Sequence, residues 1–327
     1  MTKKRILSGM RPTGKLHLGN YVGALENWVS LQGEFENYHM VADWHSLTTN
    51  YEDTSHIWDD TVDMVIDWLA AGIDPIQSPV FVQSHIKDHA ELYLIFGMLV
   101  TVPRLERNPT VKEQARELHL ESKMSYGHLG YPVLQASDIL IYRANVVPVG
   151  EDQVPHVELT REIARRFNNI YGIVFPEPAP KLTQFARLPG LDGNRMSKST
   201  GNTVLLSDTP ENILKKVKTA ITDPQKIRRG DPGRPEICLV FTFHKKFNSD
   251  ETGSIEQDCC SGVLGCVDCK NNLAAKIAQY LEPVREKRSY YEANLNEVTD
   301  IISTGDAQAR REAQETMGVV REAMKIG

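Results

Sequence analysis

The sequence has no hydrophobic run long enough to cross a bilayer, and it contains no internal repeat or low-complexity segment. The basic start, Lys3-Lys4-Arg5, is followed by only a short apolar run, so we expect no signal peptide and a cytoplasmic protein. An excess of positive charge is also missing. The formal net charge of −6 argues against a chain that coats nucleic acid nonspecifically. With 327 residues, 41% of them hydrophobic, the chain is long enough to bury a large core and form two domains.

The first half of the chain alternates between short apolar runs and segments of helical spacing. The runs lie near Ile6-Leu7, Met40-Val41-Ala42, Val80-Phe81-Val82 and Val146-Val147, and the helical segments include residues 57–69 and 92–100. This alternation predicts an α/β protein with a Rossmann-like, doubly wound parallel sheet. Ligands of such sheets lie beyond the carboxyl ends of the strands. The candidate site is therefore built from the polar segments that follow the runs, which are residues 9–20, 43–45, 83–85 and 150–153.

The first polar segment contains His17-Leu18-Gly19-Asn20, after a loop with three turn-forming residues, Gly9, Pro12 and Gly14. A helix that starts here would direct free N–H groups and its positive dipole end at a phosphate chain. Gly19 would let a nucleotide approach the backbone, and His17 and Asn20 would donate to phosphate oxygens. The alternative interpretation is an ordinary helix start with a polar cap.

A second motif, Arg195-Met196-Ser197-Lys198-Ser199, lies between a glycine-rich turn at residues 189–193 and Thr200-Gly201-Asn202. This setting predicts a mobile loop. Two cations and two hydroxyls around one methionine make a phosphate clamp that can close and open, as the departure of pyrophosphate requires. A solvated basic loop is the alternative.

Together the two motifs resemble the signatures of class I aminoacyl-tRNA synthetases, usually His-Ile-Gly-His and Lys-Met-Ser-Lys-Ser. Residues 8–14, the Leu-Gly-Asn form of the first signature and residues 148–153 further resemble the bacterial tryptophanyl enzymes of that class. Asn20 replaces the usual second histidine, a form common in tryptophanyl enzymes. Arg195 replaces the usual first lysine; it keeps the cation but changes its geometry, which affects rate rather than reaction type.

The resemblance implies an ATP-dependent ligase that joins tryptophan to tRNA(Trp) through tryptophanyl adenylate, with Mg²⁺ accompanying ATP. It implies a catalytic domain at residues 1–205, with an insertion at about 103–130 that helps form a homodimer, and a helical anticodon-binding domain at residues 206–327. An insertion without a partner is the alternative. The expected catalytic residues are Lys198, Arg195, Ser197, His17 and Asn20. The expected ATP-binding residues are Arg11, Pro12, Thr13, Gly19, Asn20, Gly150, Glu151, Asp152, Leu188, Arg195, Met196, Ser197, Lys198 and Ser199.

The amino-acid pocket is expected on a helix that opens at Tyr131, where Tyr131, Gln135 and Asp138 share one face. A carboxylate in an apolar pocket suits indole, which has one N–H donor and otherwise only carbon. Asp138 is the candidate acceptor. Tyrosyl-tRNA synthetases carry the same spacing, so that activity is an alternative, and pocket volume must decide. The expected tryptophan-binding residues are Asp138, Tyr131, Gln135, Gln153, His45 and Leu7.

A basic face in the second half is the candidate surface for RNA, with a solvated helix face as the alternative. Its members are Lys215, Lys216, Lys218, Lys226, Arg228, Arg229 and Arg234.

All five cysteines also lie in the second half. Cys266 and Cys269 form a chelating pair, Cys259 stands seven positions earlier and Cys238 lies in the preceding segment, so four thiolates can meet. Spacing alone favours zinc. Resemblance to a subset of bacterial tryptophanyl enzymes implies a 4Fe-4S cluster instead, on Cys238, Cys259, Cys266 and Cys269, with Cys260 competing for the second position. A metal-cluster nucleic-acid-binding regulator is a further alternative, but it leaves both phosphate motifs without a role.

Overall fold

A computed structural model describes residues 3–117, 119–120, 122–182 and 188–327 of the chain. The chain divides into two compact units, each made of separate stretches of sequence. The first unit comprises residues 1–14, 27–184 and 294–327, and the second comprises residues 15–26 and 185–293. In the part of the chain that the structure describes, no helix is long and apolar enough to span a membrane.

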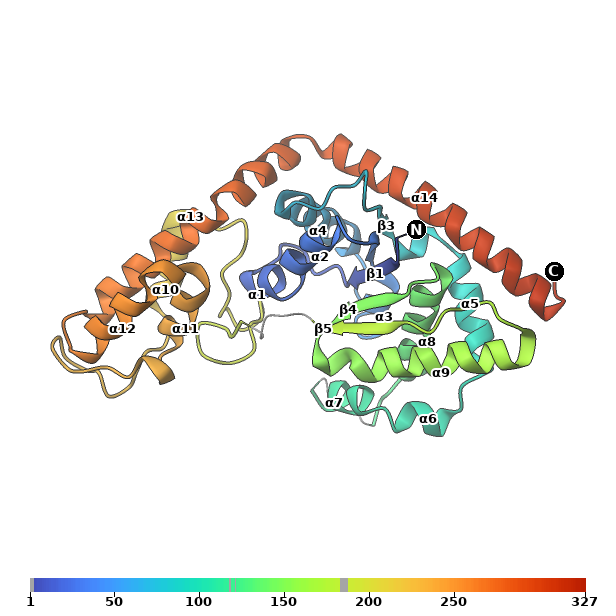
Figure 1. Cartoon of the computed structure of the whole chain (residues 1–327), viewed down its shortest axis with the longest axis horizontal. Helices are drawn as coiled ribbons and strands as arrows, with labels where there is room; N and C mark the ends of the chain where they lie inside the picture. Colours follow the sequence, from blue (N-terminus) through green and yellow to red (C-terminus); the bar gives the residue numbers. More distant parts are fainter. Residues whose placement is uncertain (1–2, 118, 121, 183–187) are drawn as a thin grey trace. The chain divides into compact units, whose positions relative to one another are not determined.

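A five-stranded parallel sheet forms the centre of the first unit, with strand order β3-β2-β1-β4-β5 (Figure 1). The strands are β1 (Arg5–Met10), β2 (Glu36–Val41), β3 (Val80–Val82), β4 (Val146–Val149) and β5 (Ala179–Leu182). The doubly wound sheet is confirmed, and the four predicted apolar runs all contribute to strands. The fifth strand was missed because its sequence, Ala-Pro-Lys-Leu, has no apolar run. The topology changes direction at β1, so the carboxyl ends of β1 and β4 flank the expected ligand position.

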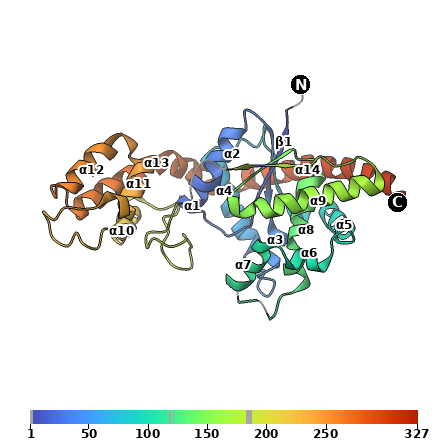
Figure 2. The same ribbon diagram turned by 60° about the horizontal axis from the view of Figure 1, so that its bottom comes forward.

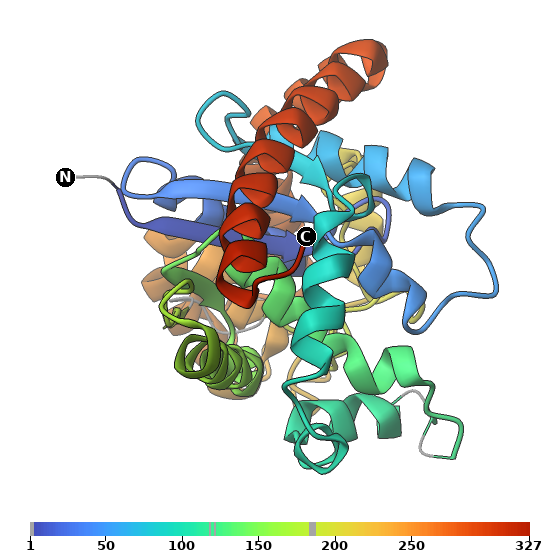
Figure 3. The same cartoon turned by 90° about the vertical axis from the view of Figure 1, so that its right-hand side faces the viewer.

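Helices cover this sheet and complete its core. They are α2 (Glu26–Leu31), α3 (Asp43–Leu47), α4 (Ile57–Ala71), α5 (Asp88–Gly97), α6 (Val102–Glu106), α7 (Pro109–Glu117), α8 (Tyr126–Ile141), α9 (Val154–Tyr171) and α14 (Leu295–Met324), with the 3₁₀ turns η2 (Gln83–His85) and η3 (Glu151–Gln153). Leu7, Met40 and Phe81 from the strands pack in one cluster with buried side chains of α8, α9 and α14. Figure 3 shows α14 running beside α5, with which it is in contact.

The helix that was expected to open at Tyr131 begins five residues earlier, at Tyr126. The hydroxyl of Ser125 accepts the N–H of His128 at 3.1 Å, which is the bond of a serine N-cap. Residues 125–128 therefore form a cap and a first helical turn. Within the expected insertion, α7 ends at Glu117, and residues 118 and 121 lie outside the described part of the chain.

The second unit is helical (Figure 2). Its elements are α1 (Leu18–Asn20), the π-helical turn η1 (Tyr21–Leu25), α10 (Pro210–Lys218), η4 (Pro235–Ile237), α11 (Leu239–Phe247), η5 (Ser249–Glu251), α12 (Thr252–Cys260) and α13 (Cys266–Ala293). The compact units do not coincide with the predicted division at residue 206, because α14 belongs to the unit that contains the sheet. Its Ala309, Ala313 and Met317 are buried in the core of that unit. The functional division into catalytic and anticodon-binding regions stays a prediction.

We predict that buried His39 makes the fold less stable in mild acid. Its ring stacks on Trp28 with centroids 5.1 Å apart, and neither ring nitrogen has a hydrogen-bond partner among the described residues. Burial lowers the pKa of His39 to about 3. As the pH falls below the ordinary histidine pKa, the unfolded chain binds a proton that the folded chain does not, so stability decreases by up to about 1.4 kcal/mol per pH unit.

The measurement is the free energy of unfolding in urea at about pH 7 and about pH 4.5. His39→Phe keeps an aromatic ring on Trp28 and should show a smaller loss in acid than the unchanged protein. Replacement of exposed His56 by Phe is the control. It should lose as much free energy of unfolding between about pH 7 and about pH 4.5 as the unchanged protein does. Equal losses in the His39 variant and the unchanged protein would contradict the prediction.

Candidate active site

The first motif forms a reciprocal cap at the start of α1. Asn20 donates its N–H to Nδ1 of His17 at 3.3 Å, and the side-chain oxygen of Asn20 accepts the N–H of His17 at 3.1 Å. Burial, and then the charge of Lys198, lower the pKa of His17 to about 4. The ring is therefore neutral at physiological pH, and because Nδ1 accepts a hydrogen bond, the proton lies on Nε2. His17 presents an uncharged N–H donor.

The backbone N–H groups at this helix start have partners within the chain, which corrects the expectation that they are free. Leu18 donates to the carbonyl of Val204 at 2.9 Å, and Gly19 donates to the sulfur of Met196 at 3.3 Å. The expectation failed because it treated the first motif alone, whereas the second motif packs on it. Gly19 favours this close approach, since a Cβ there would lie 3.0 Å from the His17 ring and 3.3 Å from the Met196 sulfur, and these side chains would have to shift.

The second motif is held by Asn202, a residue that the sequence analysis placed only as part of a loop. The buried Asn202 accepts the N–H of Ser197 at 2.8 Å and donates to the carbonyl of Arg195 at 3.0 Å and to a carboxylate oxygen of Asp192 at 2.7 Å. One amide side chain thus fixes the loop on both sides of Met196. Its position in Thr200-Gly201-Asn202, directly after the motif, was the signal that could have identified it.

The polar side chains of the second motif are on the surface of the same unit. Arg195, Lys198 and Ser199 are exposed, and Nζ of Lys198 donates to the carbonyl of Lys15 at 3.1 Å. The hydroxyls of Ser197 and Ser199 lie 2.8 Å apart. The structure therefore brings Met196 and Lys198 of the second motif close to Gly19 and His17 of the first. Leu188, also expected at ATP, is buried in this unit.

In the first unit, the carboxylate of Asp138 is the centre of a buried polar network. Only 1% of Asp138 is exposed, and its oxygens contact Nε2 of His45, Nδ1 of His89 and the amide nitrogen of Gln83, each at 2.7 Å. Burial alone would raise the pKa of Asp138, but the hydrogen bonds from the two histidines outweigh it and lower the pKa to about 2. Asp138 is therefore an anion, with three of its acceptor positions already used.

A second polar chain passes through Tyr131, another of the expected tryptophan-binding residues. Its hydroxyl lies 3.0 Å from Nε2 of His156, whose Nδ1 lies 3.3 Å from the amide nitrogen of Asn108. Since that amide donates to Nδ1, the neutral ring carries its proton on Nε2 and donates to Tyr131. Burial lowers the pKa of His156 to about 4, which keeps this arrangement at neutral pH.

The other expected tryptophan-binding residues occupy different environments. Leu7 is buried in the hydrophobic core beside Met40. Gln135 is half-buried on α8, and the amide of Gln153 donates to the carboxylate of Asp152 at 3.0 Å. Gln83 was expected only as part of the polar segment at residues 83–85, and neither Gln83 nor His89 was predicted as a partner of Asp138. The position of Gln83 directly after β3 was the available signal, whereas His89 lies further on, in α5.

The expected ATP-binding residues of the first unit follow β1 and β4. Arg11 donates to the Thr49 hydroxyl at 3.4 Å, and it lies near Tyr131 closely enough to affect the pKa of that phenol, which burial raises. Pro12 is buried and Thr13 is exposed. Gly150, Glu151 and Asp152 come directly after β4, and the two carboxylates are exposed.

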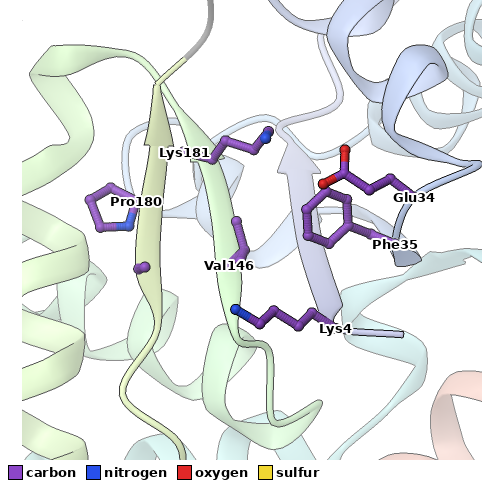
Figure 4. Close-up of a pocket in the computed structure, with 7 residues that line it drawn as sticks. Lys4, Glu34, Phe35, Val146, Pro180 and Lys181 are labelled. Carbon is purple, nitrogen blue, oxygen red and sulfur yellow. The ribbon is translucent and has the colours of Figure 1, made fainter. Parts of the chain in front are cut away.

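Two cavities lie on the first unit. One of about 310 Å³ is lined by Tyr131 and by Trp44, Leu47, Thr48, Ala90, Tyr93, Gly127 and Leu134, all of which come from α3, α5, α8 and their adjoining turns. The other, of about 440 Å³, lies at the amino ends of the strands, where the ammonium of Lys181 sits 5.3 Å from the Phe35 ring centroid (Figure 4). Its remaining lining residues are Lys4, Glu34, Val146, Ala179 and Pro180. This second cavity contains none of the predicted site residues.

The four predicted cluster ligands lie at helix ends of the second unit. Cys238 precedes α11, Cys259 is in the last turn of α12, and Cys266 and Cys269 are in the first turn of α13. Burial, and then the neighbouring thiols of Cys238, Cys259 and Cys266, raise the pKa of Cys269 to about 12. The four thiols therefore share one neighbourhood. Exposed Cys260 is not among the groups that act on Cys269.

A metal centre at these cysteines was tested against their arrangement. Among the described residues, no three side chains of histidine, cysteine, aspartate or glutamate converge to hold one metal ion, so a single zinc ion is not supported. A 4Fe-4S cluster instead places each thiolate on a different iron, so the sulfurs need not meet at one point. Gly233 lies close against this group, since a Cβ there would lie 2.6 Å from the sulfur of Cys259. The grouping of the four thiols is compatible with a cluster, and the described residues form no site for a single ion.

Comparison with known proteins places these features in one family. The family model for class I tRNA synthetases (W and Y) matches residues 2–282. The tryptophan–tRNA ligase of Thermotoga maritima is 50% identical over 325 residues, which cover 98% of this chain and 99% of that protein. The tryptophan–tRNA ligase of Aquifex aeolicus is 44% identical over 393 residues, covering 98% and 100%. The solved tryptophanyl-tRNA synthetase of Campylobacter jejuni, complexed with ADP and tryptophan, has a TM-score of 0.89 at 30% identity and covers 98% of this chain and 100% of its own.

We predict that Asn202→Ala loosens the second motif without unfolding the unit. The variant loses the three hydrogen bonds that join Asn202 to Ser197, Arg195 and Asp192. The two bonds to backbone groups are worth about 0.5–1.5 kcal/mol each, and the bond to the carboxylate about 1.5–3 kcal/mol. Amide hydrogen exchange should become faster in residues 195–199 and stay slow in α13. Asn194→Ala is the matched control, because Asn194 is exposed and bonds Asp192 without its side chain bonding the motif. Exchange in residues 195–199 that is as slow as in the control would show that Asn202 does not hold the loop.

Proposed function

The chain belongs to the class I tRNA synthetases of the tryptophan and tyrosine group, and from this premise we propose that it is a tryptophan–tRNA ligase. The observation that carries the proposal is the full-length match to tryptophan–tRNA ligases at 40–50% identity. The enzyme activates tryptophan with ATP and transfers it to tRNA(Trp), releasing pyrophosphate and then AMP. A nucleic-acid-binding regulator would have no use for the two phosphate motifs, which the second unit brings together.

Activation is a substitution at the α-phosphorus of ATP. The tryptophan carboxylate forms a bond to this phosphorus while the bond to pyrophosphate breaks, and Mg²⁺ bound with ATP supplies positive charge against the phosphates. Lys198, Arg195 and Ser197 stabilise the charge that grows on the leaving pyrophosphate. His17 donates from its neutral Nε2–H, and Asn20 donates from its amide nitrogen. The chain acts by position and charge, without a covalent intermediate.

The proposal divides the remaining substrate contacts among the expected residues. Asp138 accepts the indole N–H at the acceptor position that its three present hydrogen bonds leave. Tyr131 and Gln153 bind the amino-acid head group. The exposed carboxylates of Glu151 and Asp152 accept from ribose and adenine beside Gly150. The remaining proposed contacts with tryptophan come from Gln135, His45 and Leu7. The remaining proposed contacts with ATP come from Arg11, Pro12, Thr13, Leu188, Met196 and Ser199.

The second step transfers tryptophan to RNA. By class resemblance, the 2′-hydroxyl of the terminal ribose attacks the carbonyl carbon of the mixed anhydride, and AMP leaves. The basic face proposed for RNA is smaller than its sequence indicated: Lys216 pairs with Asp208 at 2.6 Å, and Arg234 pairs with Asp223 at 2.6 Å. Buried Lys226 donates to backbone carbonyls. The remaining members are Lys215, Lys218, Arg228 and Arg229.

The enzyme acts as a homodimer, as is typical of tryptophanyl-tRNA synthetases. Exposed apolar side chains in the first unit support this proposal. Leu94 and Met98 are exposed on and just after α5, and Tyr126 is exposed at the start of α8, with its hydroxyl close to Gly97. A surface of this kind marks a contact with another protein chain.

The test of the proposed function is amino-acid-dependent exchange between ATP and pyrophosphate, measured with tryptophan and tyrosine in parallel. Exchange is expected with tryptophan alone. Lys198→Ala should lower kcat by about 100- to 1,000-fold, because it removes one donor to the developing charge. Lys215→Ala is the control and should keep activation at the level of the unchanged enzyme, since Lys215 lies outside both motifs. Exchange with tyrosine alone would move the assignment to tyrosyl-tRNA synthetase, and exchange with neither would support the regulator.

We further propose that Cys238, Cys259, Cys266 and Cys269 bind a 4Fe-4S cluster. Their shared neighbourhood at three helix ends supports this site. The first turn of α13 adds the favourable field of a helix start to the thiolates of Cys266 and Cys269. When bound, such a cluster would cross-link the ends of α11, α12 and α13. No step of the proposed reaction uses it.

Iron and acid-labile sulfide in anaerobically purified protein test the cluster. We expect four irons for each chain by the definition of the cluster type, about none in Cys259→Ser and an unchanged content in Cys260→Ser. This pair of variants decides between the two adjacent cysteines. Zinc in place of iron would favour a single-ion site, and loss of iron in the Cys260 variant alone would exchange the two assignments.

A further inference from the structure

Helix α14 returns to the sheet and lies against β3, the strand at its edge (Figure 3). The approach is close at Gly305, where any Cβ would overlap the carbonyl oxygen of Val80. Such contact requires glycine whatever the helix propensity of the position. The next residue, Asp306, accepts the N–H of Val82 at 2.9 Å. A carboxylate on a helix thus accepts a backbone N–H of an edge strand, a side of the strand where no further strand supplies acceptors.

The same carboxylate holds the turn that follows the strand. Its second oxygen contacts Nδ1 of His85 at 2.6 Å, and Arg310, one helical turn further on, donates to the carbonyl of His85 at 3.1 Å. Asp306 is itself buried. The segment from Val82 to His85 is therefore fixed at both ends by α14.

Gln83 lies between these two fixed points. It is fully buried, and its amide nitrogen donates to Asp138 at 2.7 Å. The following N–H, from Ser84, donates to a carboxylate oxygen of Asp43 at 3.0 Å. The direction of the Gln83 side chain is consequently set by backbone positions that Asp306 holds.

We propose that Asp306 is a positioning residue for tryptophan recognition. Acting through Val82 and His85, it fixes Gln83, and Gln83 in turn orients the carboxylate of Asp138 so that an acceptor position faces the indole N–H. This inference rests on the proposed function, in which Asp138 recognises tryptophan. It assigns a role in substrate selection to the last helix of the chain, outside both signature motifs.

The test compares KM for tryptophan, KM for ATP and kcat in Asp306→Ala, Asp306→Asn and a control. The Ala variant loses both hydrogen bonds, and the Asn variant keeps an acceptor for the Val82 N–H. Arg321→Ala is the matched control, because it removes an ion pair between the same helix and Glu91 of α5 without contact to β3. Circular dichroism and Tm report whether each variant is folded.

We expect Asp306→Ala to raise KM for tryptophan about tenfold, as the loss of hydrogen bonds to a charged group predicts, with KM for ATP unchanged. Asp306→Asn should recover part of this loss. Discrimination against tyrosine should also decrease in the Ala variant, and Arg321→Ala should change only Tm.

An unchanged KM for tryptophan in folded Asp306→Ala, or equal changes in both KM values as in a general loss of stability, would overturn the inference and leave the proposed function intact. If the unchanged enzyme gives no exchange with tryptophan, the proposed function fails and the inference fails with it. Asp306→Asn keeps the test decisive if the Ala variant does not fold.

Discussion

The burial of one negative charge organises the sheet edge where tryptophan recognition is proposed. An ionised carboxylate that is 1% exposed is stable only when donors replace the water it has lost. Asp138 obtains these donors from α3, η2 and α5, through His45, Gln83 and His89. The low pKa of Asp138 shows that these bonds outweigh the cost of burial. The three segments must therefore keep their relative positions, because each donates a hydrogen bond to one of the two carboxylate oxygens of Asp138.

The hydrogen bonds continue beyond this carboxylate. Nε2 of His89 lies 2.7 Å from the hydroxyl of Tyr142, whose ring stacks on Tyr38 of β2. On the other side of Asp138, Gln83 directly follows β3, and Asp306 of α14 accepts the N–H of Val82 in that strand. A network of this kind is strong when every member has its partner and weak when one is missing. That explains why elements distant in sequence, from β2 to the last helix, contribute to one recognition group.

The sequence predicted the elements whose signals are local. Apolar runs predicted four of the strands, and helical spacing predicted that Tyr131, Gln135 and Asp138 lie on one helix, which is α8. The features that the sequence did not predict depend on contacts between segments that are distant in sequence. The donors of Asp138 are recognisable only after the sheet brings them together, and the return of α14 depends on the missing Cβ of Gly305. The N–H of Gly19 was expected to be free because its partner, Met196, lies 177 residues away.

That bond between Gly19 and Met196 accounts for the methionine between the cations of the second motif. A thioether sulfur is a weak acceptor, whereas a phosphate oxygen is a charged and much stronger one. The sulfur keeps the N–H from being buried without a partner, yet it forms a bond that a phosphate group would readily replace. Neutral His17 fits the same proposal, because a neutral ring would donate to phosphate without adding a second charge beside Lys198. In the proposed mechanism the cations, Arg195 and Lys198, lie on this loop, so the attraction for pyrophosphate would be lost on its withdrawal.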